Sequence, residues 1–179
     1  LLARESGGGP FDERLSGLWW QLATALRAAG VNAPLPQGCA SATVELRGEG
    51  DVSHDTAQHD AQAIFAFLEH AGALTTQKPP QLPPMVCQPT PLAGSQTLRS
   101  PVAGVLVFLV RPGAHVNVGD VVAEVIDPTA AGQARVFEVR AEVSGVLYAS
   151  VRERYIVSGG EVGKIAGATP FRSGDLLGA

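Results

Sequence analysis

The sequence predicts the last part of an α/β sheet domain, followed by a small all-β domain. Three observations support this prediction: helical periodicity on both sides of one alternating stretch in the first 74 residues, a proline-rich segment after them, and an internal repeat of short β-branched runs after residue 98. The boundaries that we expect are 1–74 for the α/β part, 75–98 for a linker, 99–168 for the β domain and 169–179 for a tail.

The composition disfavours several classes of function. The 179 residues carry 13 Lys and Arg against 17 Asp and Glu, which gives a formal net charge of −4. Nucleic acids and acidic membranes are bound by clustered Lys and Arg, so we expect neither as a partner. No apolar run approaches the about 20 residues that span a bilayer, and the first six residues do not have the order of charged and apolar parts found in a signal peptide.

The cysteines indicate the cellular compartment of the protein, and the first residues indicate whether the chain is a fragment. Cys39 and Cys87 lie in different segments and lack the spacing of metal ligands. We interpret them as free thiols in a reducing compartment and therefore expect a cytoplasmic protein. The chain begins without Met and in the middle of an apolar pattern, which predicts a fragment of a longer protein.

A first amphipathic helix is predicted between Pro10 and Gly30. Asp12 and Glu13 lie near its positive N-terminal end, and Gly30 follows as a stop signal. Apolar residues recur at helical spacing along it: Phe11, Leu15, Leu18, Trp19, Leu22 and Leu26. This stripe indicates that the helix packs against something larger.

A strand is predicted from Ala40 to Leu46, because apolar and polar residues alternate there. Ala42, Val44 and Leu46 would lie on one face, and Ser41, Thr43 and Glu45 on the other. Glu45 would therefore stand on the polar face at the carboxyl end of the strand, just before the loop 47–51. Ligands and catalytic groups collect at this end of strands in open α/β sheets.

A second amphipathic helix is predicted to begin after Ser53 and to end at Gly72. Ser53 is suited to cap the helix, and Asp55 lies in its first turn. The apolar stripe consists of Ala57, Ala61, Ile64, Phe65, Leu68 and Ala71. Strand, loop and helix in this order are typical of an α/β domain. The segment Lys78-Pro79-Pro80-Gln81-Leu82-Pro83-Pro84 then predicts a semi-rigid linker.

The β domain is predicted from a repeat. Val102-Ala103-Gly104-Val105-Leu106 returns as Val143-Ser144-Gly145-Val146-Leu147, and Gly119-Asp120-Val121 returns as Gly160-Glu161-Val162, both 41 positions later. Each copy has short β-branched runs separated by turns, and neither copy can bury its apolar face alone. We therefore expect two interlocked halves with pseudo-twofold symmetry.

This pattern resembles the barrel-sandwich hybrid of biotinyl and lipoyl carrier domains. In those carriers the hairpin between the halves presents a modifiable lysine, and the corresponding hairpin here, residues 127–133, contains none. Lys78 precedes the domain and Lys164 falls in its last strand. A carrier role is therefore the least favoured function, and a non-carrier appendage is expected.

A more specific resemblance depends on the order of four features. They are the string Thr43-Val44-Glu45-Leu46-Arg47-Gly48-Glu49-Gly50, a helix that ends with Leu68-Glu69-His70-Ala71-Gly72, the proline-rich linker, and Ser100-Pro101-Val102-Ala103-Gly104 at the start of a lysine-free β domain. In this order they resemble the succinylglutamate desuccinylase/aspartoacylase family of zinc-dependent deacylases, which is related to the zinc carboxypeptidases. The resemblance extends from about Phe11 to Gly167.

The resemblance implies a chemistry and a role for Glu45. In this family two histidines and a glutamate hold zinc in an α/β domain, and a glutamate at the end of a later strand activates the zinc-bound water. Glu45 matches that later position. Zinc lowers the pKa of its water to about 7, and a nearby carboxylate can accept the proton as the water attacks an amide. The implied substrate is an N-acyl amino acid or a similar small molecule.

The chain departs from the family at the metal ligands. In the family the His-x-x-Glu pair and the third ligand precede the catalytic glutamate, whereas all four histidines here, His54, His59, His70 and His115, follow Glu45. His54 and His59 are five residues apart, too far around a helix to share a face, and are interpreted as surface residues. We therefore expect the zinc ligands in an N-terminal half outside this chain, which would be its partner.

Arg47 and Tyr155 are weaker candidates for substrate binding. Arg47 follows Glu45 by two residues and would contact a substrate carboxylate, although the family more often has a small residue there. Tyr155 lies in a turn of the second β repeat. It would reach toward the catalytic domain or serve a structural role.

Two functions of different classes remain open from the sequence. In the first, the chain is the C-terminal part of a zinc-dependent amidohydrolase. In the second, it is a non-catalytic binding or assembly module built on a lysine-free barrel. The apolar surface that half an α/β sheet would expose also predicts a homo-oligomer contact. The coding sequence upstream of Leu1 would separate the two functions, since only the enzyme needs a His-x-x-Glu motif there.

Overall fold

The protein is described here from a computed structural model. The structure describes residues 11–36, 38–39, 41–75, 81, 83–85, 87–129, 135–174 and 176. The chain divides into two compact units, Leu1–Ala40 with Pro89–Ala179, and Ser41–Gln88. The predicted boundaries at residues 74, 98 and 168 are not tested by this division and stay predictions.

The first predicted helix is confirmed as α1 (Phe11–Ala28). It ends where Gly30 adopts a φ of 79°, and the Val31 amide donates to the Leu26 carbonyl at 2.9 Å, which satisfies a backbone oxygen that the helix itself cannot pair. Gly38 lies against the Trp19 ring so closely that a β-carbon there would meet a ring carbon at 2.3 Å. The apolar stripe of α1 is largely exposed, with Phe11 and Leu18 the most open.

The strand predicted at residues 40–46 is wrong. Residues 41–46 pair with no strand, and among the described residues no strand precedes Ser95. Val44 is 70% exposed and Leu46 is 52% exposed, although both belong to the face that was expected to be buried. Alternation predicts which face of a strand is apolar, but a sheet forms only where a neighbouring strand accepts and donates the backbone hydrogen bonds. The described residues of this unit provide no such neighbour, so they form no α/β sheet.

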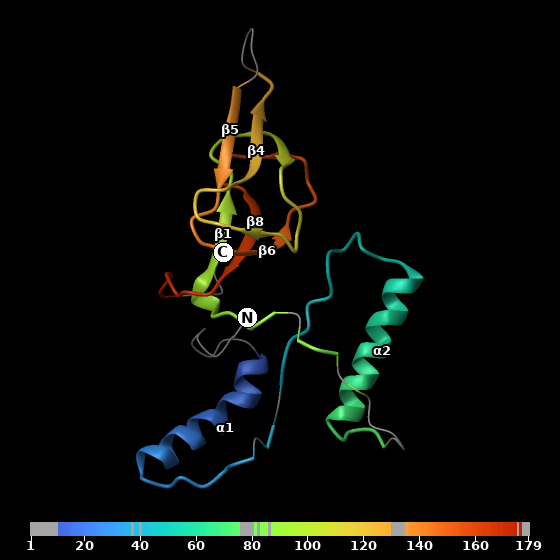
Figure 1. The fold of residues 1–179 in the computed structure, drawn as a ribbon, viewed down its shortest axis with the longest axis vertical. Helices are drawn as coiled ribbons and strands as arrows, with labels where there is room; N and C mark the ends of the chain where they lie inside the picture. The colour runs from blue at the N-terminus through green and yellow to red at the C-terminus, as the bar shows by residue number, and fades with distance from the viewer. Residues whose placement is uncertain are drawn as a thin grey trace. The chain divides into compact units, whose positions relative to one another are not determined.

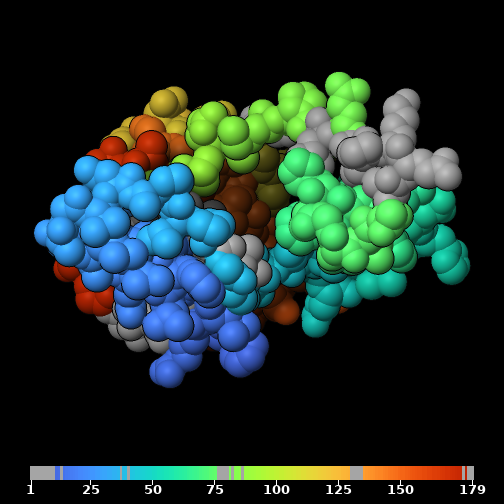
Figure 2. All heavy atoms as spheres, turned by 90° about the horizontal axis from the view of Figure 1, so that it is seen from below, coloured from blue at the N-terminus to red at the C-terminus, as the bar shows by residue number. Residues whose placement is uncertain are grey.

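The second predicted helix is confirmed as α2 (His54–His70). Ser53 is its N-cap, and its hydroxyl accepts a hydrogen bond from the Thr56 amide at 3.1 Å. Gly72 follows with a φ of 75°. No residue of α2 is buried, and the apolar side chains of Ile64 and Phe65 are exposed. Atoms of this helix are uncovered on the face shown in Figure 2.

Between Ser95 and Gly167 the described chain forms two four-stranded antiparallel sheets, several of whose strands are labelled in Figure 1. The sheets have the strand orders β1-β8-β6-β3 and β5-β4-β2-β7. A short 3-10 helix, η2 (Leu92–Gly94), precedes them. The strands are β1 (Ser95–Arg99), β2 (Gly104–Phe108), β3 (His115–Val116), β4 (Val121–Asp127), β5 (Arg135–Arg140), β6 (Gly145–Ser150), β7 (Tyr155–Ile156) and β8 (Glu161–Gly167).

The predicted interlocking of two halves is confirmed by the strand pairing. In the first half β2 pairs with β4, and it also pairs with β7 of the second half. In the second half β6 pairs with β8, and it also pairs with β3 of the first half. Both sheets contribute to one core, whose most buried members are Leu98, Leu106, Val122, Val125, Leu147, Val162 and Ile165. Assignment of this domain to the barrel-sandwich hybrid type stays a prediction.

The second part of the predicted repeat is displaced by one residue. Gly119 has its structural counterpart in Gly159, 40 positions later, because both glycines have a positive φ (90° and 77°) in equivalent turns. Their amides also donate to equivalent carbonyls, those of Ala141 and Ser100. The predicted match of Gly119 with Gly160 was therefore wrong by one position. The first part, 41 positions apart, is correct for the turn at Gly104 and Gly145 and for the strands that begin there.

The hairpin between the two halves is described only at its base. β4 ends at Asp127 and β5 begins at Arg135, and residues 130–133 of the predicted hairpin lie outside the described residues. The Asp127 carboxylate accepts hydrogen bonds from the hydroxyl and the amide of Thr129, which lower the pKa of Asp127. Lys164 lies in β8, where its ammonium group is 3.2 Å from Glu161. Lys78 lies outside the described residues.

The segment after β8 is tied to the start of the β domain. The amides of Phe171 and Arg172 both donate to the Ala93 carbonyl, at 3.0 and 3.1 Å. Leu176 is buried together with Leu92 and Ala93. The first part of the predicted tail is therefore held against the start of the β domain at these residues.

Replacing Gly145 with alanine should destabilise the β domain by about 1–3 kcal/mol, the usual cost of overpacking. A β-carbon at Gly145 would stand 2.1 Å from the Ala166 carbonyl oxygen, which belongs to the paired strand β8 and cannot move without breaking the pairing. The measurement is urea unfolding followed by circular dichroism.

Gly17→Ala is the matched control for this substitution. The same methyl group added at Gly17 meets nothing within 4 Å and lies inside α1, so it should stabilise by about 1 kcal/mol. Equal stability of the Gly145→Ala and wild-type proteins would contradict the close approach of β6 and β8.

Candidate functional site

Glu45 lies in an exposed, extended segment that leads toward α2. The residues around it, 42–50, are all exposed. The carboxylate therefore stands where a small molecule and water can reach it. The predicted location at a sheet edge is wrong because the strand does not form, but the predicted place just before a loop and a helix is correct.

Arg47 has a backbone conformation that is unusual for its residue type. Its φ is 41°, and it is the one non-glycine residue with a positive φ among the described residues. A side chain in this left-handed region costs free energy, roughly 1–2 kcal/mol, because its β-carbon crowds a backbone carbonyl. Such a conformation persists where surrounding contacts fix it.

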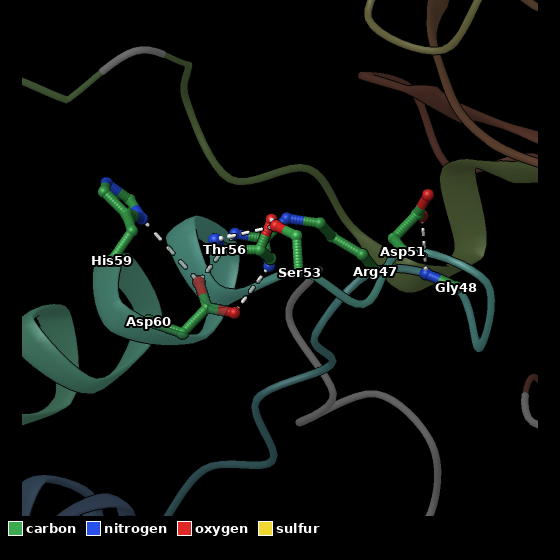
Figure 3. Close-up of polar contacts among 7 residues, drawn as sticks. All are labelled: Arg47, Gly48, Asp51, Ser53, Thr56, His59 and Asp60. Carbon is green, nitrogen blue, oxygen red and sulfur yellow. Dashed lines mark hydrogen bonds and ion pairs between the residues drawn. The ribbon is translucent and has the colours of Figure 1, made fainter.

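The Arg47 side chain forms a two-pronged ion pair with Asp60 of α2. Its Nη1 donates to Asp60 Oδ2 and its Nη2 donates to Asp60 Oδ1, each at 2.6 Å (Figure 3). The Arg47 side chain is 41% exposed and the Asp60 side chain is 16% exposed. The hydrogen bonds raise the pKa of the Arg47 guanidinium and lower the pKa of the Asp60 carboxyl. Both groups are thus held in their charged forms at neutral pH.

A tight turn and the helix cap connect these two residues. The Asp51 amide donates to the Gly48 carbonyl at 3.0 Å, and the Asp51 carboxylate accepts from the Gly48 amide at 3.1 Å. Ser53 then caps α2, as Figure 3 also shows. The Gly48–Asp51 turn, the Ser53 cap and the ion pair of Asp60 with Arg47 therefore restrain the chain between Arg47 and Asp60.

The histidines do not assemble a metal site. His59 Nδ1 lies 3.7 Å from Asp60 Oδ1, and its side chain is 76% exposed. His54 and His70 stand at opposite ends of α2, and His115 lies on β3 in the other unit. Across the described residues, no group of three or more His, Cys, Asp and Glu side chains could hold a metal ion. The described residues therefore do not fit a zinc ion.

Tyr155 belongs to the other unit. It lies on β7 opposite Val105 of β2, and it is 65% exposed. Glu45 and Arg47 lie two residues apart on one segment, whereas Tyr155 belongs to the β domain. Its predicted role in substrate binding is not tested and stays a prediction.

Asp60 was missed by the sequence reasoning. The helix that carries it was predicted, and its acidic side chain lies at the edge of the predicted apolar stripe, one turn before Ile64. The weak signal available was one acidic residue on the helix that follows Arg47. Arg47 and Asp60 are 13 residues apart, and their contact occurs together with the left-handed backbone at Arg47. Arginine rarely adopts this conformation, so the residue type at position 47 does not predict it.

Comparison with known proteins supports the family resemblance through structure. No family model matches the sequence, and no curated protein matches it. A succinylglutamate desuccinylase/aspartoacylase family protein from Shewanella amazonensis SB2B matches 90% of this chain with a TM-score of 0.67 and 25% identity. The product-bound ectoine utilization protein EutE (DoeB) from Ruegeria pomeroyi matches 70% of this chain with a TM-score of 0.55 and 28% identity.

A third structure supports the same fold. The succinylglutamate desuccinylase/aspartoacylase from Shewanella frigidimarina NCIMB 400 matches 91% of this chain with a TM-score of 0.70 and 22% identity. The chain covers 44%, 37% and 43% of the three structures in turn, less than half of each. The predicted resemblance to this family is thus confirmed, and the chain shares the fold of part of such proteins.

Proposed function

We propose that this chain is part of a deacylase that hydrolyses the amide bond of an N-acyl amino acid or a similar small molecule. The observation that carries the proposal is the match of 90% of the chain to a succinylglutamate desuccinylase/aspartoacylase family protein at 25% identity. The name of the family denotes cleavage of an acyl group from an amino acid, and the Glu45 carboxylate is a group suited to that chemistry.

Glu45 is proposed as the general base. Its carboxylate would take a proton from the water that attacks the amide carbonyl and would then pass this proton to the departing amine. Exposure of the segment 42–50 supports access of substrate and water. The tether of the following residues to α2 supports a defined position for the carboxylate.

Zinc is proposed for the whole protein only through residues outside those described. The described residues do not fit the metal, as the dispersed histidines show. The ligands would come from an N-terminal half of the catalytic domain. Metal analysis of the protein produced from its complete coding sequence tests this part of the proposal separately from catalysis.

The exposed apolar stripes of the helices support packing against further polypeptide. Leu18 on α1 and Phe65 on α2 expose more than half of their surfaces, which is costly for large apolar side chains in water. We propose that these stripes pack against the N-terminal half of the catalytic domain. The alternative partner is a second copy of the chain. Uncovered atoms of α1 can be followed in Figure 2.

Location in the cytoplasm is part of the proposal. Neither Cys39 nor Cys87 forms a disulfide, which agrees with a reducing compartment. None of the helices in the described part of the chain has the length and apolar character to cross a membrane.

The proposed function is tested by incubating the protein from the complete coding sequence with a panel of N-acetyl and N-succinyl amino acids. We expect release of the free amino acid from at least one of them, measured by mass spectrometry. Absence of hydrolysis by a folded protein loaded with zinc would contradict the proposal and would favour the non-catalytic binding module.

A further inference from the structure

We infer that the Arg47–Asp60 ion pair is a positioning device for Glu45. In this interpretation the pair fixes the backbone just after Glu45 to the start of α2, and Arg47 does not bind the substrate. The inference rests on the proposed function, in which Glu45 is the general base.

The geometry of the pair restricts both side chains to one arrangement. Two parallel bonds of 2.6 Å join the planar guanidinium to the planar carboxylate, so the relative distance and orientation of the two groups are both fixed. Asp60 lies in the second turn of α2, whose backbone is fixed by helical hydrogen bonds and by the Ser53 cap. The Asp60 carboxylate is therefore fixed in position by α2, and the ion pair restrains the Arg47 side chain.

The backbone geometry transfers this restraint to Glu45. Arg47 keeps a left-handed φ of 41°, which directs the chain into the turn between Gly48 and Asp51. Glu45 stands two residues before Arg47, a span of at most about 7 Å of chain. Loss of the ion pair would remove the contact that fixes the unfavourable φ, and the segment that carries Glu45 would then be free to move.

The same geometry argues against Arg47 as a substrate contact. Nη1 and Nη2 are already bonded to the two oxygens of Asp60, so this face of the guanidinium is occupied. A substrate carboxylate could bind at this face only by displacing Asp60 and leaving that carboxylate without its partner. The two roles predict different kinetics, because a positioning residue affects kcat whereas a substrate contact affects KM.

The test compares Asp60→Asn, Arg47→Gln and the double variant in the full-length protein, with N-succinylglutamate as the first probe and the best substrate of the panel as the second. We expect each single variant to lower kcat by about tenfold or more while KM stays within about twofold, because small misplacement of a catalytic group has a large effect on rate. The double variant should lose no more than either single variant, since both remove the same contact.

Glu138→Gln is the matched control. It breaks another exposed arginine–carboxylate contact, that of Arg140 with Glu138 in β5, in the unit that does not contain Glu45. Its kcat and KM should equal those of the wild-type protein. Arg47→Lys keeps the charge but lacks the two-pronged fork, so its kcat should fall as in Arg47→Gln. The Arg47 side chain is partly exposed, so this variant should fold like the wild-type protein.

Hydrogen exchange provides a readout that does not depend on activity. The amides of Gly48 and Asp51, which are hydrogen-bonded in the turn, should exchange about tenfold faster in Asp60→Asn than in the wild-type chain, and those of β8 should be unchanged. Unchanged exchange, or a raised KM with unchanged kcat, would overturn the inference. If no N-acyl amino acid is hydrolysed by the wild-type protein, the proposed function fails; if Glu45→Gln retains full activity, Glu45 is not the general base and the positioning role loses its premise. If Glu45→Gln is inactive and Asp60→Asn keeps wild-type kcat, only the positioning role fails.

Discussion

Leu147→Ala is expected to destabilise the β domain by about 2–5 kcal/mol, the range found when a buried leucine is truncated. Leu147 is 0% exposed and lies on β6 opposite Ile165 of β8, which is also fully buried. The backbone on both sides of the cavity is fixed by strand pairing, and the Gly113 amide donates to the Leu147 carbonyl at 2.7 Å. Collapse of the surrounding structure into the space is therefore restricted, which places the expected loss in this range.

Two further leucines make this experiment specific. Leu106 is the counterpart of Leu147 in the first half and is 1% exposed, so Leu106→Ala should cost a similar amount. Leu109 is 52% exposed, and Leu109→Ala, which removes the same atoms, should change stability by less than about 0.5 kcal/mol. Free energies of unfolding come from urea titrations. Equal losses at Leu147 and Leu109 would argue against the single core shared by the two sheets.

The two helices could be predicted from the sequence because their signals are local. A helix satisfies most of its backbone hydrogen bonds within itself, so periodicity together with the caps at Ser53, Gly30 and Gly72 was sufficient. The strand expected at residues 40–46 failed for the opposite reason. Its hydrogen bonds depend on a neighbouring strand, and the described residues of that unit contain none.

The repeat shows a second limit of pattern reasoning. Interlocking of the halves followed from short strands that cannot bury their faces alone, and this part of the prediction is confirmed. The displacement by one residue is the net result of two differences. β6 (Gly145–Ser150) has one residue more than β2 (Gly104–Phe108), and the segment 151–154 between β6 and β7 has two residues fewer than the segment 109–114 between β2 and β3. Matching letters could not reveal this difference, because glycine also occupies position 160, next to the structural counterpart Gly159.

The candidate site was predictable only in part. Glu45 was found because it matches the catalytic glutamate of the family and stood at the end of a predicted strand, although that strand does not form; Arg47 was found because it follows Glu45 by two residues. Asp60 was not found, because its contact with Arg47 depends on the positive φ of a residue that normally avoids it. A resemblance that led to Glu45 also could not indicate Asp60, since the family more often has a small residue where Arg47 stands.

Glu45→Gln is expected to lower kcat/KM of the full-length protein by about 10²–10⁴-fold, the contribution typical of a general base. The amide of glutamine has nearly the size of the carboxylate and can still accept a hydrogen bond, but it cannot take a proton from water at neutral pH. Glu45 is exposed and Arg47 retains its contact with Asp60, so the substitution should leave the fold and the tether to α2 unchanged.

Glu49→Gln, the same change in the same exposed segment, is the control that separates loss of a base from loss of a surface charge. Both variants lose one negative charge, so any effect on attraction of a charged substrate should be similar in both, whereas only Glu45→Gln should lose the proton acceptor. Initial rates of amino acid release, at substrate concentrations well below and well above KM, measure the difference. Comparable rates for Glu45→Gln and the wild-type protein would remove Glu45 from the reaction, and equal losses in the two variants would assign the effect to charge.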